Sequence, residues 1–492
     1  MKVSAFFLTT AAVLSIGASS VLAQGLSPGY VSPSLRYAAN ASVETYPSAD
    51  SYYASNADLE ARITQLEQSI SKKADKPDTS KAFDVRLNGR VFFESITFGD
   101  PQVKYGDFGG QSDILGAREV HIGIAGTGYS ILDYSVEIGY TAGNTEFRDV
   151  VLGVKNVPGL DYVRVGHYKL ETGMGYVTSG LNSTAMETTT ATQVFSPGRR
   201  FGIGQTYYFA DEKVRWFNGL FASEGVTGTK FITDSDGVVY NSRLTFVPYY
   251  ARDGARYFHF GGHYMYRDNP NGNNADFNAT NARIGGFNRA GAWFTPVALN
   301  ASYYNQGGLE AAWGCGPLAM SSEFFAGSFG NGRDMYGGHI EVRYFLTGDT
   351  RPYNKRNGVQ GGVRLKENFL TAEGLIQTCH HGLAKGFCIK SWGAWEVYTQ
   401  WGFTDSDRVA RGDARIVENV SGAYHSGGRT TDLVLGLNWY WNPTTRVMFE
   451  YVRSDGTAKR SEYVVTDGVG ATVNRGYRAT EDIFAAGLRF NF

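Results

Sequence analysis

Apolar and polar residues alternate along most of this chain with the period of two that is typical of β-strands. In residues 85–94 the odd positions are apolar apart from one glycine, whereas the even positions include Arg86, Arg90 and Glu94. This arrangement places one face in an apolar medium and the other in water. The pattern therefore predicts a strand that faces lipid on one side and an aqueous lumen on the other.

The same alternation recurs often enough to predict sixteen strands in all. The further segments are 118–128, 132–142, 147–155, 161–169, 199–210, 213–222, 238–248, 256–267, 305–314, 318–328, 336–347, 391–404, 429–441, 445–455 and 480–492. A closed antiparallel barrel needs an even number of strands if both of its ends lie on one side of the membrane. The sequence therefore predicts an all-β fold, a 16-stranded antiparallel transmembrane β-barrel.

The connections alternate in length, and this orients the barrel. The short turn-forming connections are 156–159, 210–213, 314–317 and 442–444, and they lie on the side of both barrel ends, the periplasm. The long connections on the other side are 99–117, 170–198, 268–304, 405–428 and 456–479. The stretch 348–390 is long but lies on the periplasmic side. We expect either that it folds into or under the barrel, or that the strand count is wrong by two there.

The chain ends on an aromatic strand. Phe484, Leu488, Phe490 and Phe492 share one parity, and Arg489 lies on the other. A barrel must seal its last strand against its first and bury that seam in lipid, since open edges have unpaired amides. We expect this strand to close the barrel and to be needed for its assembly.

The N-terminal residues predict export. Residues 1–23 contain the basic Lys2, then an apolar stretch, and end at Ala23 in a small-x-Ala cleavage pattern, which is typical of a signal peptide. Residues 24–57 are rich in Ser, Ala, Tyr and Asn without a period, so we expect a flexible mature N-terminus. No later run is long and apolar enough for a transmembrane helix.

A short coiled coil is predicted ahead of the barrel. Leu59, Ile63, Leu66 and Ile70 are spaced as the seam of about two heptads, so residues 58–73 predict a small periplasmic coiled coil, or alternatively a helix that packs on the barrel. Two heptads are marginal alone and would depend on an oligomeric barrel. Residues 74–83 form a linker, and 84–492 the barrel.

Composition agrees with a barrel and excludes several classes of partner. The chain has 62 Gly, 31 Tyr and 31 Phe, which suit tight turns and aromatic girdles. Its mean hydropathy of -0.27 argues against a helical membrane protein. Because Lys plus Arg number 46 and Asp plus Glu 47, no global charge points to nucleic acid, and selectivity must be local.

An ordered series of motifs resembles the phosphate-selective porin O/P family. The early motifs are REVHIG at 118–123, YSVEIGY at 134–140, FRDVVLG at 147–153 and RVGHYK at 164–169. The later motifs are SPGRRFG at 196–202, YFLTGDTRPYN at 344–354, GAWE at 393–396 and GLNWYWNP at 436–443. The resemblance implies a homotrimeric outer-membrane porin whose channel is narrowed by an inward-folded loop, is lined by basic side chains, and passes small anions such as phosphate.

Strand parity selects the arginines that can line such a channel. The candidates are Arg86, Arg90, Arg164, Arg199, Arg200, Arg243, Arg267, Arg343 and Arg489. A guanidinium is charged at any physiological pH and matches phosphate oxygens with its planar fork. The alternative is an ordinary hydrated barrel wall, because several carboxylates share the same parity.

The constriction is expected in the loop 170–198. Where the family commonly has Met-Glu-Arg, this chain has Met186-Glu187-Thr188, followed by Thr189 and Thr190. The lower basic charge argues for a moderately selective channel rather than a strictly phosphate-selective one, unless arginines of the facing wall compensate.

Three cysteines are left to explain. Cys379 and Cys388 are close enough in sequence to form a disulfide in the oxidising periplasm. The same segment contains His380 and His381, so a metal site is the alternative, and free thiols are a third. We expect no cofactor.

Other functions remain open at this point. An enzyme is disfavoured because the chain has only 8 His, and these are scattered among strands and loops. A barrel that only anchors an envelope structural or adhesion protein would explain the coiled coil equally well. Conductance in planar bilayers separates that alternative from a porin.

Overall fold

The computed structural model describes residues 83–99, 112–141, 144–223, 237–268, 277–278, 282–287, 290–294, 297–298, 301–330, 332–369, 377–381, 384–388, 391–406, 427–466 and 469–492. The backbone alone is described at 141, 144, 277–278, 297–298, 333, 377–381, 384–388, 458–466 and 469–477. The predicted signal peptide, flexible segment, coiled coil and most of the linker lie outside these residues. Those four segments stay predictions.

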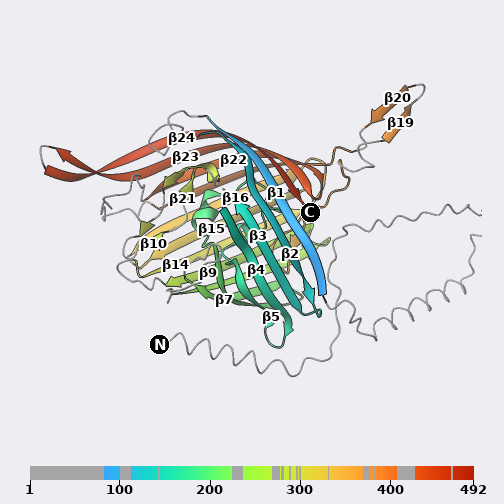
Figure 1. Cartoon of the computed structure of the whole chain (residues 1–492), viewed down its shortest axis with the longest axis horizontal. Helices are drawn as coiled ribbons and strands as arrows, with labels where there is room; N and C mark the ends of the chain where they lie inside the picture. Colours follow the sequence, from blue (N-terminus) through green and yellow to red (C-terminus); the bar gives the residue numbers. More distant parts are fainter. Residues whose placement is uncertain are drawn as a thin grey trace, which may run out of the picture. The chain divides into compact units, whose positions relative to one another are not determined.

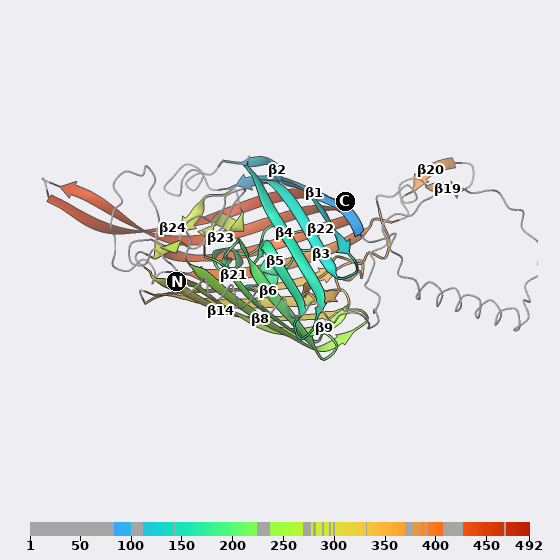
Figure 2. The same ribbon diagram turned by 60° about the horizontal axis from the view of Figure 1, so that its bottom comes forward.

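Sixteen strands close into one antiparallel barrel (Figures 1 and 2). They are β1 (Phe83–Phe98), β2 (Ile114–Gly128), β3 (Leu132–Thr141), β4 (Asn144–Val157), β5 (Asp161–Lys169), β6 (Arg199–Phe209), β7 (Val214–Ala222), β8 (Val238–Ala251), β9 (Arg256–Asp268), β14 (Tyr303–Cys315), β15 (Leu318–Phe329), β16 (Arg333–Phe345), β21 (Ala394–Asp405), β22 (Gly427–Asn442), β23 (Thr445–Thr466) and β24 (Val469–Asn491). Each predicted strand corresponds to one of them. The predicted fold class and strand count are therefore confirmed.

The last strand closes the barrel against the first, as predicted. Phe490 lies opposite Val91 in the β1–β24 ladder. Beyond it the Phe492 amide donates to the Gly89 carbonyl at 3.1 Å, and the Gly89 amide donates to the Phe492 carbonyl at 3.0 Å. Phe490 and Phe492 are exposed on the outer face. Large apolar residues at every second position of other strands, such as Ile122, are exposed in the same way. The outer surface therefore offers lipid an apolar band.

The prediction for one of the long connections is wrong. Residues 456–479, expected as an extracellular loop, instead continue β23 and β24, whose pairing reaches Thr466 opposite Val469. The sequence between these two residues is Asp467-Gly468, a pair that favours a two-residue hairpin turn. Both strands are therefore longer than the alternation predicts.

The barrel interior is filled by inward-folded segments in addition to strand side chains. Within 268–304 the short strands β10 (Phe277–Asn278), β11 (Ala282–Arg283), β12 (Ala292–Phe294) and β13 (Val297–Ala298) pair locally, with the 3-10 turn η5 (Ile284–Gly286) between them. Phe287 and Trp293 are fully buried, and the Trp293 indole donates to Ser454 of β23 at 2.8 Å. This segment packs against the inner wall rather than lying outside it.

The stretch 348–390 adds no strand to the barrel and folds partly into it, which is the first of the two alternatives that we expected. Two local hairpins form there, from β17 (Tyr353–Asn354) with β18 (Val359–Gln360), and from β19 (Gln377–His381) with β20 (Ala384–Cys388). Neither joins the barrel, so the strand count stands. Tyr353 and Gln360 are buried within the barrel. The helices that the structure describes are all too short to span a lipid bilayer.

Candidate pore site

The loop 170–198 crosses the lumen to the far wall. It leaves β5 and returns at β6, yet the Gly175 amide donates to Glu323 of β15 at 3.1 Å, and the Met186 amide donates to Glu450 of β23 at 2.5 Å. Asn438 of β22 donates to the Thr184 carbonyl at 2.9 Å. Carboxylates of the far wall therefore accept hydrogen bonds from the loop and hold it across the channel.

Two arginines fasten the tip of this loop. Arg489 of β24 donates to the carbonyl of Gly180 at 2.7 Å, to the hydroxyl of Ser183 at 2.9 Å and to the carbonyl of Met186. Arg446 of β23 donates to the Ser183 carbonyl at 2.7 Å and to the Gly180 carbonyl at 3.3 Å. Charged donors make strong hydrogen bonds to carbonyls. Arg489 thus both faces the lumen, as predicted, and positions the constriction.

The threonine run in the loop has a structural role. Thr189 caps the short helix α5 (Thr190–Val194) by accepting from the Thr192 amide at 3.2 Å. Thr190 donates to Asp432 of β22 at 2.5 Å. The adjacent Glu187 accepts hydrogen bonds from two of the three nitrogens of Arg118, each at 2.6 Å. The threonines therefore fix the backbone of the loop, and the facing wall supplies the basic charge.

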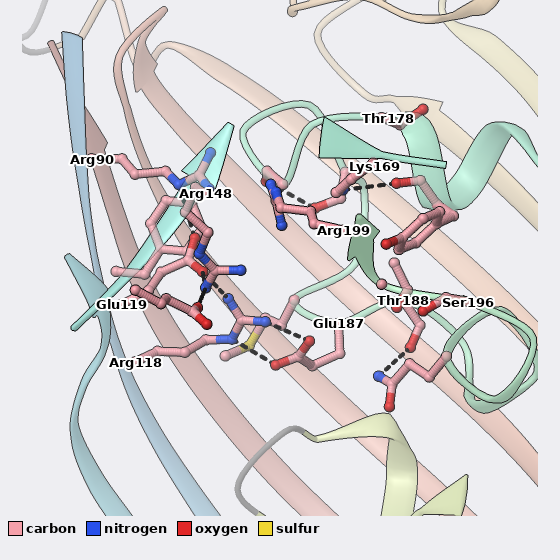
Figure 3. A pocket seen from close by; sticks show the side chains of 18 of the residues that line it. Arg90, Arg118, Glu119, Arg148, Lys169, Thr178, Glu187, Thr188, Ser196 and Arg199 are labelled. Carbon is pink, nitrogen blue, oxygen red and sulfur yellow. Dashed lines mark hydrogen bonds and ion pairs between the residues drawn. The ribbon is translucent and has the colours of Figure 1, made fainter. Parts of the chain in front are cut away.

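A cavity of about 450 Å³ lies between this loop and the wall (Figure 3). Its lining includes six cationic side chains and three carboxylates. The cations are Arg90, Arg118, Arg148, Lys169, Arg199 and Arg489, and the carboxylates are Glu119, Glu146 and Glu187. They come from β1, β2, β4, β5, β6, β24 and the loop. Basic side chains therefore outnumber carboxylates by six to three in the lining of the cavity.

Most of these cations are partly neutralised. Arg90 pairs with Glu119 at 2.9 Å, and Arg148 pairs with Glu146 at 2.9 Å. Among the described residues neither Lys169 nor Arg489 has a carboxylate oxygen within ion-pair distance. The Lys169 ammonium donates to the Tyr176 carbonyl at 2.8 Å and lies 4.9 Å from the Tyr176 ring centroid. Among the described residues, these are the two of the six basic side chains that have no carboxylate partner.

Local irregularities explain why parity missed some of these cations. In the β3–β4 ladder Val136 pairs with Val150 but Ile138 pairs with Phe147, so Arg148 and Asp149 together lie opposite one residue. A β-bulge of this kind re-aims side chains. Arg118 and Glu119 are consecutive, yet both reach the lumen. Period-two reasoning allows only one of two neighbours to point inward, so it overlooked Arg118 and Arg148. Lys169 was missed because only arginines were considered.

A second group of arginines is covered and paired. Glu171, in the loop, accepts from both terminal nitrogens of Arg215 at 2.6 and 2.7 Å and from Arg164 at 2.9 Å. Burial alone would raise the pKa of Glu171, but the guanidinium groups of Arg215, Arg164 and Arg243 outweigh it and lower this pKa to about 2. The carboxylate stays ionised at neutral pH, so it neutralises this part of the wall.

The periplasmic segment 346–369 covers further arginines. Arg243 is fully buried, pairs with Glu310 at 2.7 Å and donates to the Gly358 carbonyl at 2.6 Å. Arg343 donates to Gln360. Arg351, from the segment itself, pairs with Glu396 of β21 at 3.1 Å. This segment therefore closes off a part of the lumen that sequence parity alone would leave open.

The nine predicted arginines fall into three groups. Those that line the cavity are Arg90, Arg199 and Arg489. Those held in covered contacts are Arg164 with Glu171, Arg243 with Glu310, Arg343 with Gln360, and Arg200 and Arg267, both of which donate to Ser223. Arg86 is exposed near the start of β1, before the β1–β24 ladder begins at Arg90.

A closed sixteen-stranded barrel with an apolar outer band and a loop-narrowed, charged lumen has the architecture of an outer-membrane porin. The comparison with family models agrees, because the model for phosphate-selective porin O and P matches residues 85–492. The chain therefore belongs to this family. It is a channel of the outer membrane and not an enzyme.

Individual relatives are distant. The chain is 24% identical over 413 residues to porin O of Pseudomonas aeruginosa, which covers 76% of this chain and 84% of that protein. Among solved structures, it is similar to the trimer form of OmpT from Vibrio cholerae, with 12% identity, 84% of this chain and 100% of that chain covered, and a TM-score of 0.45. An anion-selective porin from Comamonas acidovorans gives 12% identity, 83% and 100% coverage, and a TM-score of 0.45.

Proposed function

We propose that the channel passes small anions, such as phosphate, with a weak to moderate preference over cations. The observation that carries this proposal is the cavity beside the loop 170–198, whose wall has six cations and three carboxylates. Fixed charges in a narrow aqueous pore raise the local concentration of counter-ions and exclude ions of like charge. The family description, phosphate-selective porin O and P, points in the same direction.

The preference for anions is moderate because the three carboxylates of the cavity pair with its cations. Glu187 accepts from two nitrogens of Arg118, and Glu119 pairs with the third nitrogen of Arg118 and with Arg90. An anion that enters must compete with these carboxylates for the guanidinium forks. Lys169 and Arg489 offer positive charge without such competition among the described residues. Weak, distributed attraction of this kind lets a solute enter and leave, as conduction requires.

Ion selectivity in planar bilayers tests the proposal. The purified protein is placed between potassium chloride solutions of unequal concentration, and the reversal potential is measured before and after phosphate is added as a competitor. We expect a potential of the sign that chloride permeation gives, and a conductance that phosphate lowers. A clear cation preference at moderate salt would overturn the proposal. A protein that inserts but does not conduct would favour the anchoring role instead.

We also propose that three copies assemble, with the mature chain organised as a flexible N-terminus (24–57), a coiled coil (58–73), a linker (74–83) and the barrel (84–492). The heptad spacing of Leu59, Ile63, Leu66 and Ile70 supports a contribution of the coiled coil to avidity. Deleting residues 24–80 tests this. Trimers should persist on an unheated gel, and complete conversion to monomers would show that the barrel alone does not hold them.

A further inference from the structure

A buried histidine lies directly behind the cationic wall of the cavity. His121 of β2 is 3% exposed and is not among the residues that line the cavity. It interacts electrostatically with Arg90 of β1, Glu119 of β2 and Arg148 of β4, all three of which do line the cavity (Figure 3). A charge on the His121 ring would therefore act on groups that a passing ion meets.

Both ring nitrogens of His121 face a carboxylate. Nδ1 lies 2.7 Å from Oε1 of Glu137 on β3, and Nε2 lies 3.6 Å from Oε2 of Glu119. A neutral imidazole has a hydrogen on one nitrogen only, so its other nitrogen turns a lone pair towards a negatively charged oxygen. The protonated ring has a hydrogen on each nitrogen. The surroundings thus offer a carboxylate to either hydrogen.

Arg90 uses the same two carboxylates. Its Nη2 lies 3.3 Å from the Glu137 oxygen that faces His121, and its Nε lies 2.9 Å from the other oxygen of Glu119. Glu119 and Glu137 therefore partly neutralise Arg90. A positive charge on His121 would share these carboxylates with Arg90 and so weaken that neutralisation.

A glycine brings His121 close to a second arginine. Gly139 lies opposite His121 in the β2–β3 ladder. A Cβ added at Gly139 would be 2.9 Å from both His121 Nε2 and Arg148 Nε, so these two side chains meet over the glycine.

The charged groups around the ring are evenly balanced. Those contributed by the packed strands are Arg90, Glu119, Glu137 and Arg148, whereas Glu187 of the loop 170–198 faces Arg118 instead. Two of the four surrounding groups are positive and two are negative. The protonation state of His121 therefore decides whether this part of the wall has a net positive charge.

We propose that His121 makes the anion preference of the channel depend on pH. When the ring takes up a proton from the aqueous lumen, it adds a positive charge behind the cavity and reduces the hold of Glu119 and Glu137 on Arg90. Both effects favour anions, so the preference for anions rises as the pH falls. Histidine is the side chain that ordinarily titrates between about pH 5 and 8. This inference rests on the anion preference proposed above.

Reversal potentials in a potassium chloride gradient, measured in steps from pH 8 to pH 5, test the inference. We expect the chloride-to-potassium permeability ratio of the wild type to rise about twofold over this range. His121→Gln replaces the ring by an amide that takes up no proton. Its ratio should not change with pH.

His167→Gln is the matched comparison. His167 also lines the cavity, but its Nδ1 lies 2.7 Å from the backbone carbonyl of Arg148, and among the described residues it has no carboxylate within ion-pair distance. This variant should keep the rise.

A wild-type ratio independent of pH, a rise that persists in His121→Gln, or a rise that is lost in His167→Gln would each overturn the inference and leave the channel proposal intact. A rise caused by titration of the carboxylates would be among those that persist. A preference for cations at every pH would instead overturn the channel proposal itself, and this inference with it.

A second variant covers the case in which His121→Gln does not assemble, which heat-modifiable migration on gels would show. Glu137→Gln keeps the ring but removes the nearer of its two carboxylates. Because the protonated ring loses that partner, the rise in the ratio should occur at a pH lower by about one unit. An unchanged pH profile in Glu137→Gln would overturn the inference.

Discussion

The cavity that faces the loop 170–198 and the covered wall around Glu171 use the same residue types for different ends. In the cavity, Lys169 and Arg489 have no carboxylate partner among the described residues. On the covered wall, Arg215 and Arg164 share Glu171, and Arg243 is sealed beneath Gly358. The comparison teaches that pointing into a barrel does not make an arginine a solute site. Whether an arginine can bind a solute depends on the segments that cover it and on the carboxylates that pair with it.

The largest effect is expected on the covered wall. Glu171→Gln removes the carboxylate that the buried Arg215 and the half-buried Arg164 share, while Arg243 keeps Glu310. Breaking one partner of a buried ion pair costs about 3–5 kcal/mol. We expect a lower midpoint of thermal unfolding in detergent, measured by the temperature at which folded gel migration is lost. The matched control is Glu146→Gln in the cavity, whose partner Arg148 is less buried than Arg215. If both variants lost the same stability, the distinction between the two regions would be wrong.

Removing cavity charge should alter selectivity rather than stability. A unit charge about 5 Å from an ion's path is worth about 0.8 kcal/mol in water before screening. Arg148→Gln combined with Lys169→Gln should therefore lower the chloride-to-potassium permeability ratio roughly threefold at moderate salt. The reversal potential measures it. Arg267→Gln, which removes a charge held at Ser223 outside the cavity, should leave the ratio unchanged, and an equal drop would refute the assignment of the cavity.

Arg489 both lines the cavity and holds the loop, and its variant separates these two roles. Arg489→Gln removes three hydrogen bonds to the loop but leaves Arg446 on Gly180 and Ser183. We expect a normal amount of folded protein. The single-channel conductance should rise by less than about twofold and become noisier. Deleting Phe490 to Phe492 should instead greatly reduce the folded protein, because it removes the last pairing partners of β1. Poor folding of Arg489→Gln would show that the hydrogen bonds from Arg489 to the loop are needed for assembly of the barrel.

The strands were predictable because lipid on one side and a polar interior on the other impose a strict period of two. Short turns such as 156–159 and the closing Phe492 carried enough local signal to set the order of the strands and the closure of the barrel. The interior was less predictable. Bulges moved Arg148 into the lumen, and the covers over Arg243 and Arg343 come from a segment far away in the sequence. Parity reports the direction of a side chain but not what lies in front of it.

The dependence of stability on pH tests the covered wall alone. The pKa of Glu171 is lowered from 4.5 to about 2 in the folded protein, so its ionised form stabilises the fold. This contribution is complete above pH 4.5 and is lost as pH falls from there towards 2. A shift of this size corresponds to about 3 kcal/mol. The difference in unfolding midpoint between the wild type and Glu171→Gln should therefore be constant from pH 7 to 5 and shrink steadily below 4.5. A difference that already narrowed between pH 7 and 5 would mean that Glu171 is not held by its three arginines, and the covered wall would then be no more neutralised than the cavity.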